Sequence, residues 1–129
     1  MNTSVPNDQQ ATSSLVTIQQ FHTAFNHHNV DAVMSLMTDD CVFENTFPPP
    51  DGTRVEGQAA VRACWEALFR NSPQARFDIE EVIAFADRGV LRWVYHWTDP
   101  DGHAGHVRGV DVFRVRDGKV AEKLSYVKG

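Results

Sequence analysis

The spacing of apolar residues changes part-way along the chain, and this change limits the folds that the chain can adopt. Up to Asn71 the apolar residues recur mainly at helical spacing, with one short strand-like segment between the helices. From Ala75 onward they alternate with polar residues, as they do in β-strands with one buried face. Helices followed by antiparallel hairpins indicate an α+β domain, in which the helices cover one face of a strongly curved sheet.

Three helices are predicted in the first part of the chain. The first, over 15–29, has a buried stripe, and Asn29 can cap a second helix that starts at Val30. The third helix covers 58–71. Residues 1–13 are too polar to pack and are predicted to form a disordered tail, so that the domain spans 14–129. The residues expected on the buried stripes of the first and third helices are Leu15, Ile18, Phe21, His22, Phe25, Val61, Cys64, Trp65 and Leu68.

The strands are predicted at 39–47, 75–86, 89–98, 105–116 and 119–128. The prolines in 48–57 are expected to keep that segment unpaired. In the strand over 75–86, strict alternation places one set of residues on a single side: Phe77, Ile79, Glu81, Ile83 and Phe85. In the strand over 105–116, one face is apolar except for a single carboxylate, that of Asp111.

The turn at Asp117-Gly118 sets what lies opposite Asp111. A three-residue loop with Gly118 in the left-handed conformation pairs Val115 with Lys119 and places Lys123 opposite Asp111. A register shifted by one residue would place Leu124 there and exchange the two faces. On the other side, closing the hairpin at Asp101-Gly102 puts Trp93 opposite Gly109 and Tyr95 near Val107.

Length and charge exclude several classes of protein. The 129 residues are expected to form one domain, and the net charge of −5 without a run of Lys or Arg argues against a nucleic-acid or membrane-surface partner. No apolar run is long enough to span a membrane, and the start lacks the pattern of a signal peptide, so a cytoplasmic location is expected. Cys41 and Cys64 are then expected to be free thiols.

The order of these elements resembles the nuclear transport factor 2-like fold, and within it the SnoaL-like and ketosteroid isomerase-like branch. The segments that carry the resemblance are "FNHHNVDAVMSLMTDDCVFEN", "VEGQAAV" and "GVDVFRVRDGKVAEKLSYV". It covers about residues 14–128 and implies a cone-shaped α+β fold, with three N-terminal helices packed on a strongly curved, mainly antiparallel sheet. Because this fold hosts enzymes, binding modules and assembly domains, it implies no single reaction.

The resemblance also implies roles for individual positions. The tyrosine of ketosteroid isomerases on the first helix falls on Phe21, and their general-base aspartate falls on Asn45. Their second aspartate falls on Asp111, where SnoaL-type polyketide cyclases have a general base. The water-activating aspartate of limonene epoxide hydrolases falls near Ser125. Steroid isomerisation and epoxide hydrolysis are therefore disfavoured, and cyclase-like chemistry stays open through Asp111.

Asp111 is the candidate catalytic residue, in a pocket that is mostly aromatic. The substrate-binding candidates are Phe21, Phe43, Asn45, Trp65, Leu91, Trp93, Tyr95, Trp97, Gly109, Phe113, Lys123 and Ser125. Desolvation raises the pKa of such a buried acid, whereas a neighbouring ammonium group lowers it. Contact with Lys123 would leave Asp111 ionised and a weak base, and a Lys123 that reaches out to the rim would let Asp111 act in proton transfer.

These features predict a small enzyme that carries out acid–base chemistry of the isomerase, cyclase or lyase type on a small hydrophobic carbonyl compound, without a cofactor. The alternative is a non-catalytic ligand-binding or dimerisation module, and a buried structural role for Asp111 also stays open. The outward-facing Val110, Val112, Leu124 and Tyr126 predict a homodimer. No metal is expected, because neither His27-His28 nor the pair of His103 and His106 has a carboxylate or cysteine at ligand spacing. His22 is expected to be a packed or rim residue.

Overall fold

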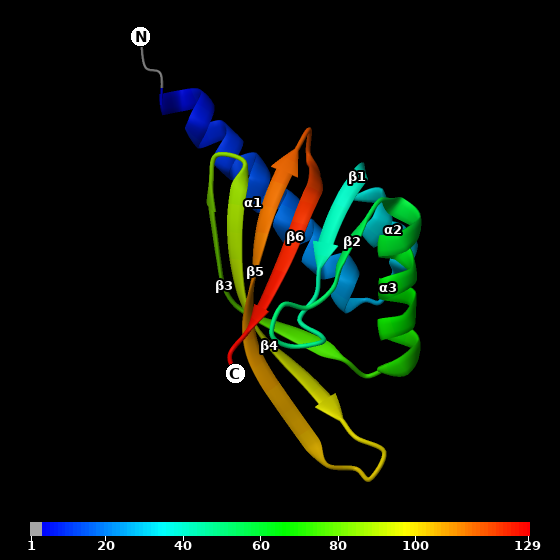
Figure 1. Cartoon of the computed structure of the whole chain (residues 1–129). Helices are drawn as coiled ribbons and strands as arrows, with labels where there is room; N and C mark the ends of the chain where they lie inside the picture. Colours follow the sequence, from blue (N-terminus) through cyan, green and yellow to red (C-terminus); the bar gives the residue numbers. More distant parts are fainter. Residues whose placement is uncertain (1–3) are drawn as a thin grey trace.

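The structure, a computed structural model, describes residues 4–129 and has the predicted α+β architecture (Figure 1). Its six strands form one sheet in the order β2-β1-β6-β5-β4-β3, in which only the β1–β6 pair is parallel. The elements are α1 (Ser4–Asn26), α2 (Val30–Ser35), β1 (Met37–Glu44), β2 (Arg54–Glu56), α3 (Gln58–Asn71), β3 (Arg76–Phe85), β4 (Arg88–Thr98), β5 (Ala104–Arg116) and β6 (Lys119–Val127).

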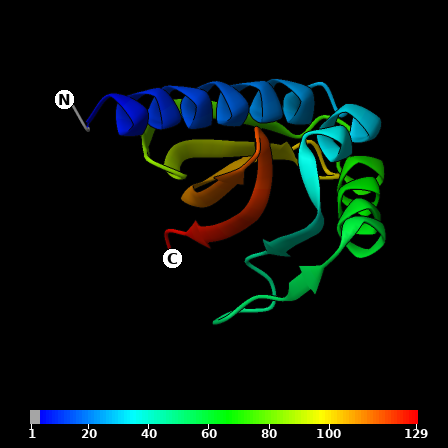
Figure 2. The same cartoon turned by 90° about the horizontal axis from the view of Figure 1, so that it is seen from above.

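The core lies between the inner face of the sheet and the helices. Figure 2 shows α1 running across the sheet, with α3 standing to one side of it. The predicted stripes on both helices are largely correct, because Ile18, Phe21, Phe25, Val61 and Trp65 are all buried. They pack in one cluster with the inward side chains of the central strands, which include Leu91, Trp93 and Phe113. No described helix has the length and apolar character needed to cross a membrane.

The N-terminal segment differs from the prediction of a disordered tail. Helix α1 begins at Ser4, so residues 4–13 are helical, and residues 1–3 lie outside the described part of the chain. A helix that is anchored at one end can extend through polar residues, because each added residue gains a backbone hydrogen bond without needing burial. The anchor starts at Ser14, whose hydroxyl donates to the carbonyl oxygen of Ala86 at 2.7 Å.

The second helix and the proline-containing loop show one confirmed and one wrong prediction. Asn29 caps α2, since its side-chain oxygen accepts a hydrogen bond from the backbone N–H of Ala32. The segment 48–57 was expected to stay unpaired, but Arg54–Glu56 forms β2 and pairs with β1. The prolines do not prevent this pairing because all of them precede the paired residues.

The β5–β6 hairpin has a different register from the predicted one. Asp117 and Gly118 both have positive φ, at 53° and 73°, and they form a two-residue turn that pairs Arg116 with Lys119. An irregularity at Val115 then brings Ser125 opposite Asp111, and Lys123 opposite Phe113. The difference is two residues, so Lys123 stays on the same face as Asp111, as expected. The predicted pairs on the other side, Trp93 with Gly109 and Tyr95 with Val107, are confirmed.

A bulge interrupts the alternation that was predicted for β3. The pairing with β4 shifts between Ile79 and Glu81, and the side chains beyond it change sides. Val82 therefore packs against the core, whereas Ile83 and Phe85 are exposed, with Phe85 at 73%. Sequence periodicity did not reveal this bulge because the residues on both sides of it are apolar at alternate positions.

Candidate functional site

A cavity of about 270 Å³ opens between the inner face of the sheet, which includes β1, and α3. Half of its lining residues are aromatic, and its polar groups are few, which is the usual composition of a small-molecule site. Eight of the predicted substrate-binding residues line it: Phe43, Asn45, Trp65, Trp93, Tyr95, Trp97, Lys123 and Ser125. The others that line it are Phe25, Thr46, Leu68, Phe77, Val107 and Val127.

Five candidate residues lie behind the cavity wall. Phe21, Leu91 and Phe113 have no exposed surface and belong to the core. Gly109 lies beneath Trp93, and a Cβ atom there would come within 2.5 Å of the Trp93 ring and of the Tyr126 carbonyl oxygen. Asp111, the predicted catalytic residue, is 1% exposed and is separated from the cavity by Lys123 and Ser125.

Most of the lining residues that were not among the candidates carried detectable signals in the sequence. Val107 and Val127 share the face of Asp111 in the strand alternation. Phe25 and Leu68 lie on the predicted apolar stripes of α1 and α3. Such stripes identify inward-facing residues, but they do not distinguish a cavity wall from packed core.

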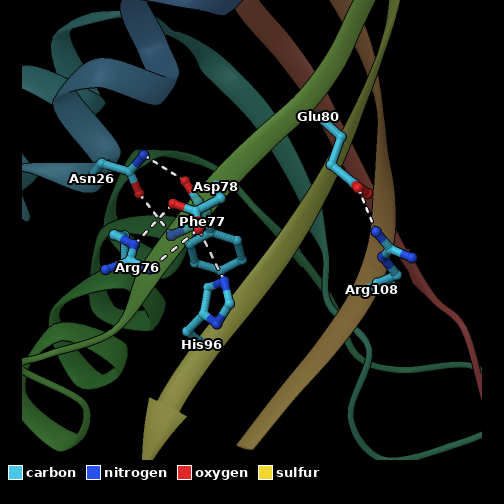
Figure 3. A network of polar contacts seen from close by, with 7 residues as sticks. All are labelled: Asn26, Arg76, Phe77, Asp78, Glu80, His96 and Arg108. Atoms are coloured by element: carbon cyan, nitrogen blue, oxygen red, sulfur yellow. Dashed lines mark hydrogen bonds and ion pairs between the residues drawn. The ribbon is translucent and has the colours of Figure 1, made fainter.

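Asn26 holds one wall of the cavity in place. Its side chain donates to the carbonyl oxygen of Phe77 at 2.8 Å and accepts from the Phe77 N–H at 3.0 Å, so that it pairs with the edge strand β3 as a neighbouring strand would (Figure 3). On the same strand, Asp78 contacts His96 of β4, and Glu80 contacts Arg108 of β5. These contacts fix the Phe77 ring against Trp93 and Tyr95.

A buried polar cluster forms the inner end of the cavity. Lys123 Nζ lies 3.2 Å from Asp111 Oδ2, and it donates to Ser125 Oγ at 3.1 Å. The Ser125 hydroxyl donates in turn to Asp111 Oδ1 at 2.7 Å. Lys123 and Asp111 are 4% and 1% exposed. Adjacent residues on β5 and β6 therefore form a closed set of contacts, in which only Lys123 and Ser125 reach the cavity.

The charge of Lys123 decides the ionisation of Asp111. Burial by itself raises the pKa of Asp111, but the Lys123 ammonium, then His22 and Ser125, outweigh it and lower the pKa to about 2. The carboxylate is thus ionised at neutral pH and is a weak base. The condition under which the sequence predicted a weak base, direct contact with Lys123, is the one found.

Three aromatic rings surround the Lys123 ammonium group. Nζ lies 4.9 Å from the centre of the Phe43 ring, 5.2 Å from that of Trp65 and 5.4 Å from that of Phe25. Such cation–π contacts stabilise a desolvated cation without neutralising it. Lys123 therefore presents a positive charge to a mainly apolar cavity, where it can interact with a negatively charged or polarised oxygen atom.

His22 is packed beside this cluster, which is one of the two placements, packed or at the rim, that the sequence predicted. It is 1% exposed, and its Nε2 lies 3.6 Å from Asp111 Oδ2. Neither ring nitrogen has a hydrogen-bond partner among the described residues. Burial lowers the pKa of His22, and the nearby Asp111 carboxylate opposes this effect only in part. His22 is therefore a neutral side chain next to an ion pair.

One histidine prediction is wrong. His103 was expected to lack a carboxylate at ligand spacing, but Asp99, Asp101 and His103 bring their ligand atoms within 4.8 Å of one another. Asp99 Oδ1 accepts the backbone N–H groups of Asp101 and His103, so this carboxylate has a structural role in the β4–β5 turn. Exposed acidic turn residues of this kind do not by themselves define a metal site.

The comparisons with known proteins agree with this architecture. Residues 18–123 match the SnoaL-like domain, so the chain belongs to the SnoaL-like family of nuclear transport factor 2-like proteins, as the sequence predicted. A comparison with curated proteins finds no match. An NTF2-like protein of unknown function from Mesorhizobium loti is 37% identical, with a TM-score of 0.78 over 93% of this chain and 94% of that one.

Two more distant structures share the fold. TerC, co-crystallised with polyporic acid, is 18% identical, with a TM-score of 0.78 over 90% of this chain and 92% of its own. Bal32a, from a soil-derived mobile gene cassette, is 15% identical, with a TM-score of 0.81 over 92% and 91%. At these identities the likeness extends to the fold alone.

Proposed function

We propose that the cavity binds a small hydrophobic carbonyl compound, and that the protein catalyses acid–base chemistry at the carbon next to the carbonyl group. The observation that carries this proposal is the buried Lys123 ammonium at the inner end of an aromatic cavity. None of the described residues that line the cavity is a carboxylate or a histidine, so a base from solvent or buffer takes the proton from the carbon next to the carbonyl group. Loss of this proton places negative charge on the carbonyl oxygen. A preorganised cation in a site that excludes water stabilises that charge far more than water does.

The three members of the cluster have different roles in this proposal. Lys123 contacts the substrate oxygen, and Ser125 is a second polar group on the cavity wall. Asp111 is a positioning residue, because it holds Lys123 and Ser125 from behind and does not reach the cavity. TerC, which shares the fold, was crystallised with polyporic acid, and this is in keeping with a hydrophobic ligand in such a cavity.

Enolisation of a simple aromatic ketone tests the proposal directly. The protein is expected to accelerate the exchange of the methyl protons of 2-acetylnaphthalene for deuterium in D2O, and NMR measures the rate of this exchange. Lys123→Met should reduce this acceleration by roughly 10²–10³-fold, the usual effect of removing one group that stabilises an oxyanion. Lys119→Met changes an exposed lysine on the same strand and is the control. It should accelerate the exchange of the ketone protons as much as the parent does. Exchange at the rate of buffer alone would refute enolisation, and equally accelerated exchange by Lys123→Met and the parent would refute the role of Lys123 in it.

One observation favours a second candidate, a non-catalytic ligand-binding module. Asp111 is not on the cavity wall, and its carboxylate is a weak base. Tight binding of 2-acetylnaphthalene without any proton exchange would support this candidate over the enzyme.

We also propose that the outer face of the sheet pairs with a second copy of the chain. Four apolar residues form a continuous row across it: Ile83, Val90, Val112 and Leu124 are successive partners from β3 to β6. Tyr126, opposite Val110, extends this row and is 51% exposed. Light scattering at micromolar concentration should give twice the mass of one chain, and Val112→Glu should reduce it to one. A single-chain mass for the parent would rule out the dimer.

A further inference from the structure

The charges of the buried cluster of Asp111, Lys123 and His22 sum to zero as long as no charged ligand lies against Lys123. The Asp111 carboxylate offsets the Lys123 ammonium, and His22 is neutral beside them. An anionic ligand oxygen placed against Lys123 adds a second negative charge in a region where water cannot compensate for it. In such surroundings a nearby group changes its protonation state rather than leave a charge unbalanced.

His22 is the group placed to respond. The charged groups facing it are Asp111 of β5, 3.6 Å away, and Lys123 of β6. The aromatic rings next to it are those of Phe21, Phe25, Phe77 and Phe113. Both of its ring nitrogens lack hydrogen-bond partners among the described residues, so a proton can be added without breaking an existing contact. A shift of a few tenths of an ångström would bring Nε2 within hydrogen-bond distance of Asp111.

We propose that binding of an anionic ligand beside Lys123 is coupled to the uptake of one proton from solvent by His22. The ligand offsets the Lys123 charge, which otherwise repels a proton from His22, and leaves the attraction of the Asp111 carboxylate unopposed. After uptake the imidazolium and the ammonium balance the carboxylate and the ligand anion, so the cluster is again neutral. His22 is thus a positioning residue that acts on the ligand through Asp111 and Lys123.

The pKa values are consistent with this assignment. The pKa of His22 is lowered chiefly by burial, with Asp111 raising it and Lys123 lowering it, so removal of the Lys123 contribution moves it upward. Asp111 is the other possible proton acceptor, but its pKa of about 2 must rise much further before the carboxylate takes up a proton near neutrality.

The test uses a charged ligand and its neutral counterpart. Titration calorimetry of 2-naphthoate at pH 6, in buffers with different heats of ionisation, gives the number of protons taken up on binding. The parent should take up a proton with 2-naphthoate, approaching one per ligand as the pH falls, and none with 2-naphthamide. The affinity for 2-naphthoate should rise by up to tenfold for each unit of falling pH. In His22→Gln both the proton uptake and the pH dependence of affinity should disappear.

The possible failures separate this inference from the proposed function on which it rests. Binding of 2-naphthoate without proton uptake, or uptake that persists in His22→Gln, would overturn the coupling and leave the cavity intact. Binding of 2-naphthamide but not of 2-naphthoate would refute the anion site. Failure of both ligands to bind would refute the cavity itself. If His22→Gln does not fold, ¹⁵N NMR of the parent decides: the His22 ring should become doubly protonated with 2-naphthoate, and an unchanged neutral ring would contradict the proposal.

Discussion

Asp111→Asn is expected to lower the free energy of unfolding by roughly 3–5 kcal/mol, because it leaves the Lys123 ammonium buried without a counter-charge. Lys123→Met should cost a similar amount, since it leaves the Asp111 carboxylate unpaired at the same depth. The double variant should recover most of the loss, because replacing a whole buried ion pair with neutral groups of similar size is often nearly neutral. Urea unfolding of the four proteins at pH 7 measures these differences.

An exposed ion pair provides the control for this cycle. Arg62 and Asp31 are 2.7 Å apart, but Asp31 is 89% exposed, so Asp31→Asn should change the stability by no more than about 1 kcal/mol. If Asp111→Asn were as stable as the parent, Asp111 would be a residue kept at a cost to stability, as proton-transferring groups are. That result would contradict the positioning role and restore Asp111 as the candidate general base.

The free energy of unfolding should depend on pH, and His22 should make a large contribution to this dependence. Burial lowers its pKa in the folded protein below the ordinary value of 6.5. As the pH falls below about 6.5, the unfolded chain takes up a proton at this position while the folded protein does not. The stability that His22 contributes is therefore complete above pH 6.5 and is lost on acidification, at up to about 1.4 kcal/mol per pH unit.

Asp111 acts in a lower pH window and in the same direction. Its folded-state pKa of about 2 is depressed, so its contribution is complete above an unfolded value of about 3.9 and is lost as the pH falls toward 2. Urea unfolding between pH 7 and 5 therefore isolates His22. His22→Gln should flatten the decline in this range, and His27→Gln, at an exposed position just after α1, should follow the parent. Parallel curves for His22→Gln and the parent would show that His22 is not held neutral by burial.

Periodicity was sufficient to predict the α+β class because both of its kinds are strong in this sequence, whereas the nuclear transport factor 2-like fold was predicted from the resemblance of particular segments. The helical stripes that contain Phe25 and Trp65 and the alternation through Trp93 and Asp111 each identify the buried face of an element. What the pattern could not show were local shifts in backbone pairing. The bulge near Glu80 and the irregularity at Val115 each change a register through backbone geometry, which leaves little trace in residue type.

The sequence predicted which face of the sheet carries the candidate site, but not how deep each side chain lies behind the cavity wall. Alternation placed Asp111, Lys123 and Ser125 on one side of the sheet, and all three meet there. Whether the carboxylate or the ammonium reaches the cavity depends on side-chain length and on the packing of Phe43 and Trp65 around Lys123. Neither factor can be read from periodicity. For this reason the lysine, and not the predicted aspartate, is the charged group that lines the cavity.

The most direct measurement of this role for Lys123 is a crystal structure of the protein with 2-naphthoate bound. We expect a carboxylate oxygen within hydrogen-bond distance of Lys123 Nζ, the rings between Trp65 and Trp93, and the contact of Lys123 with Asp111 retained. A ligand whose carboxylate lies at the Asn45 side of the cavity, without contact to Lys123, would contradict it.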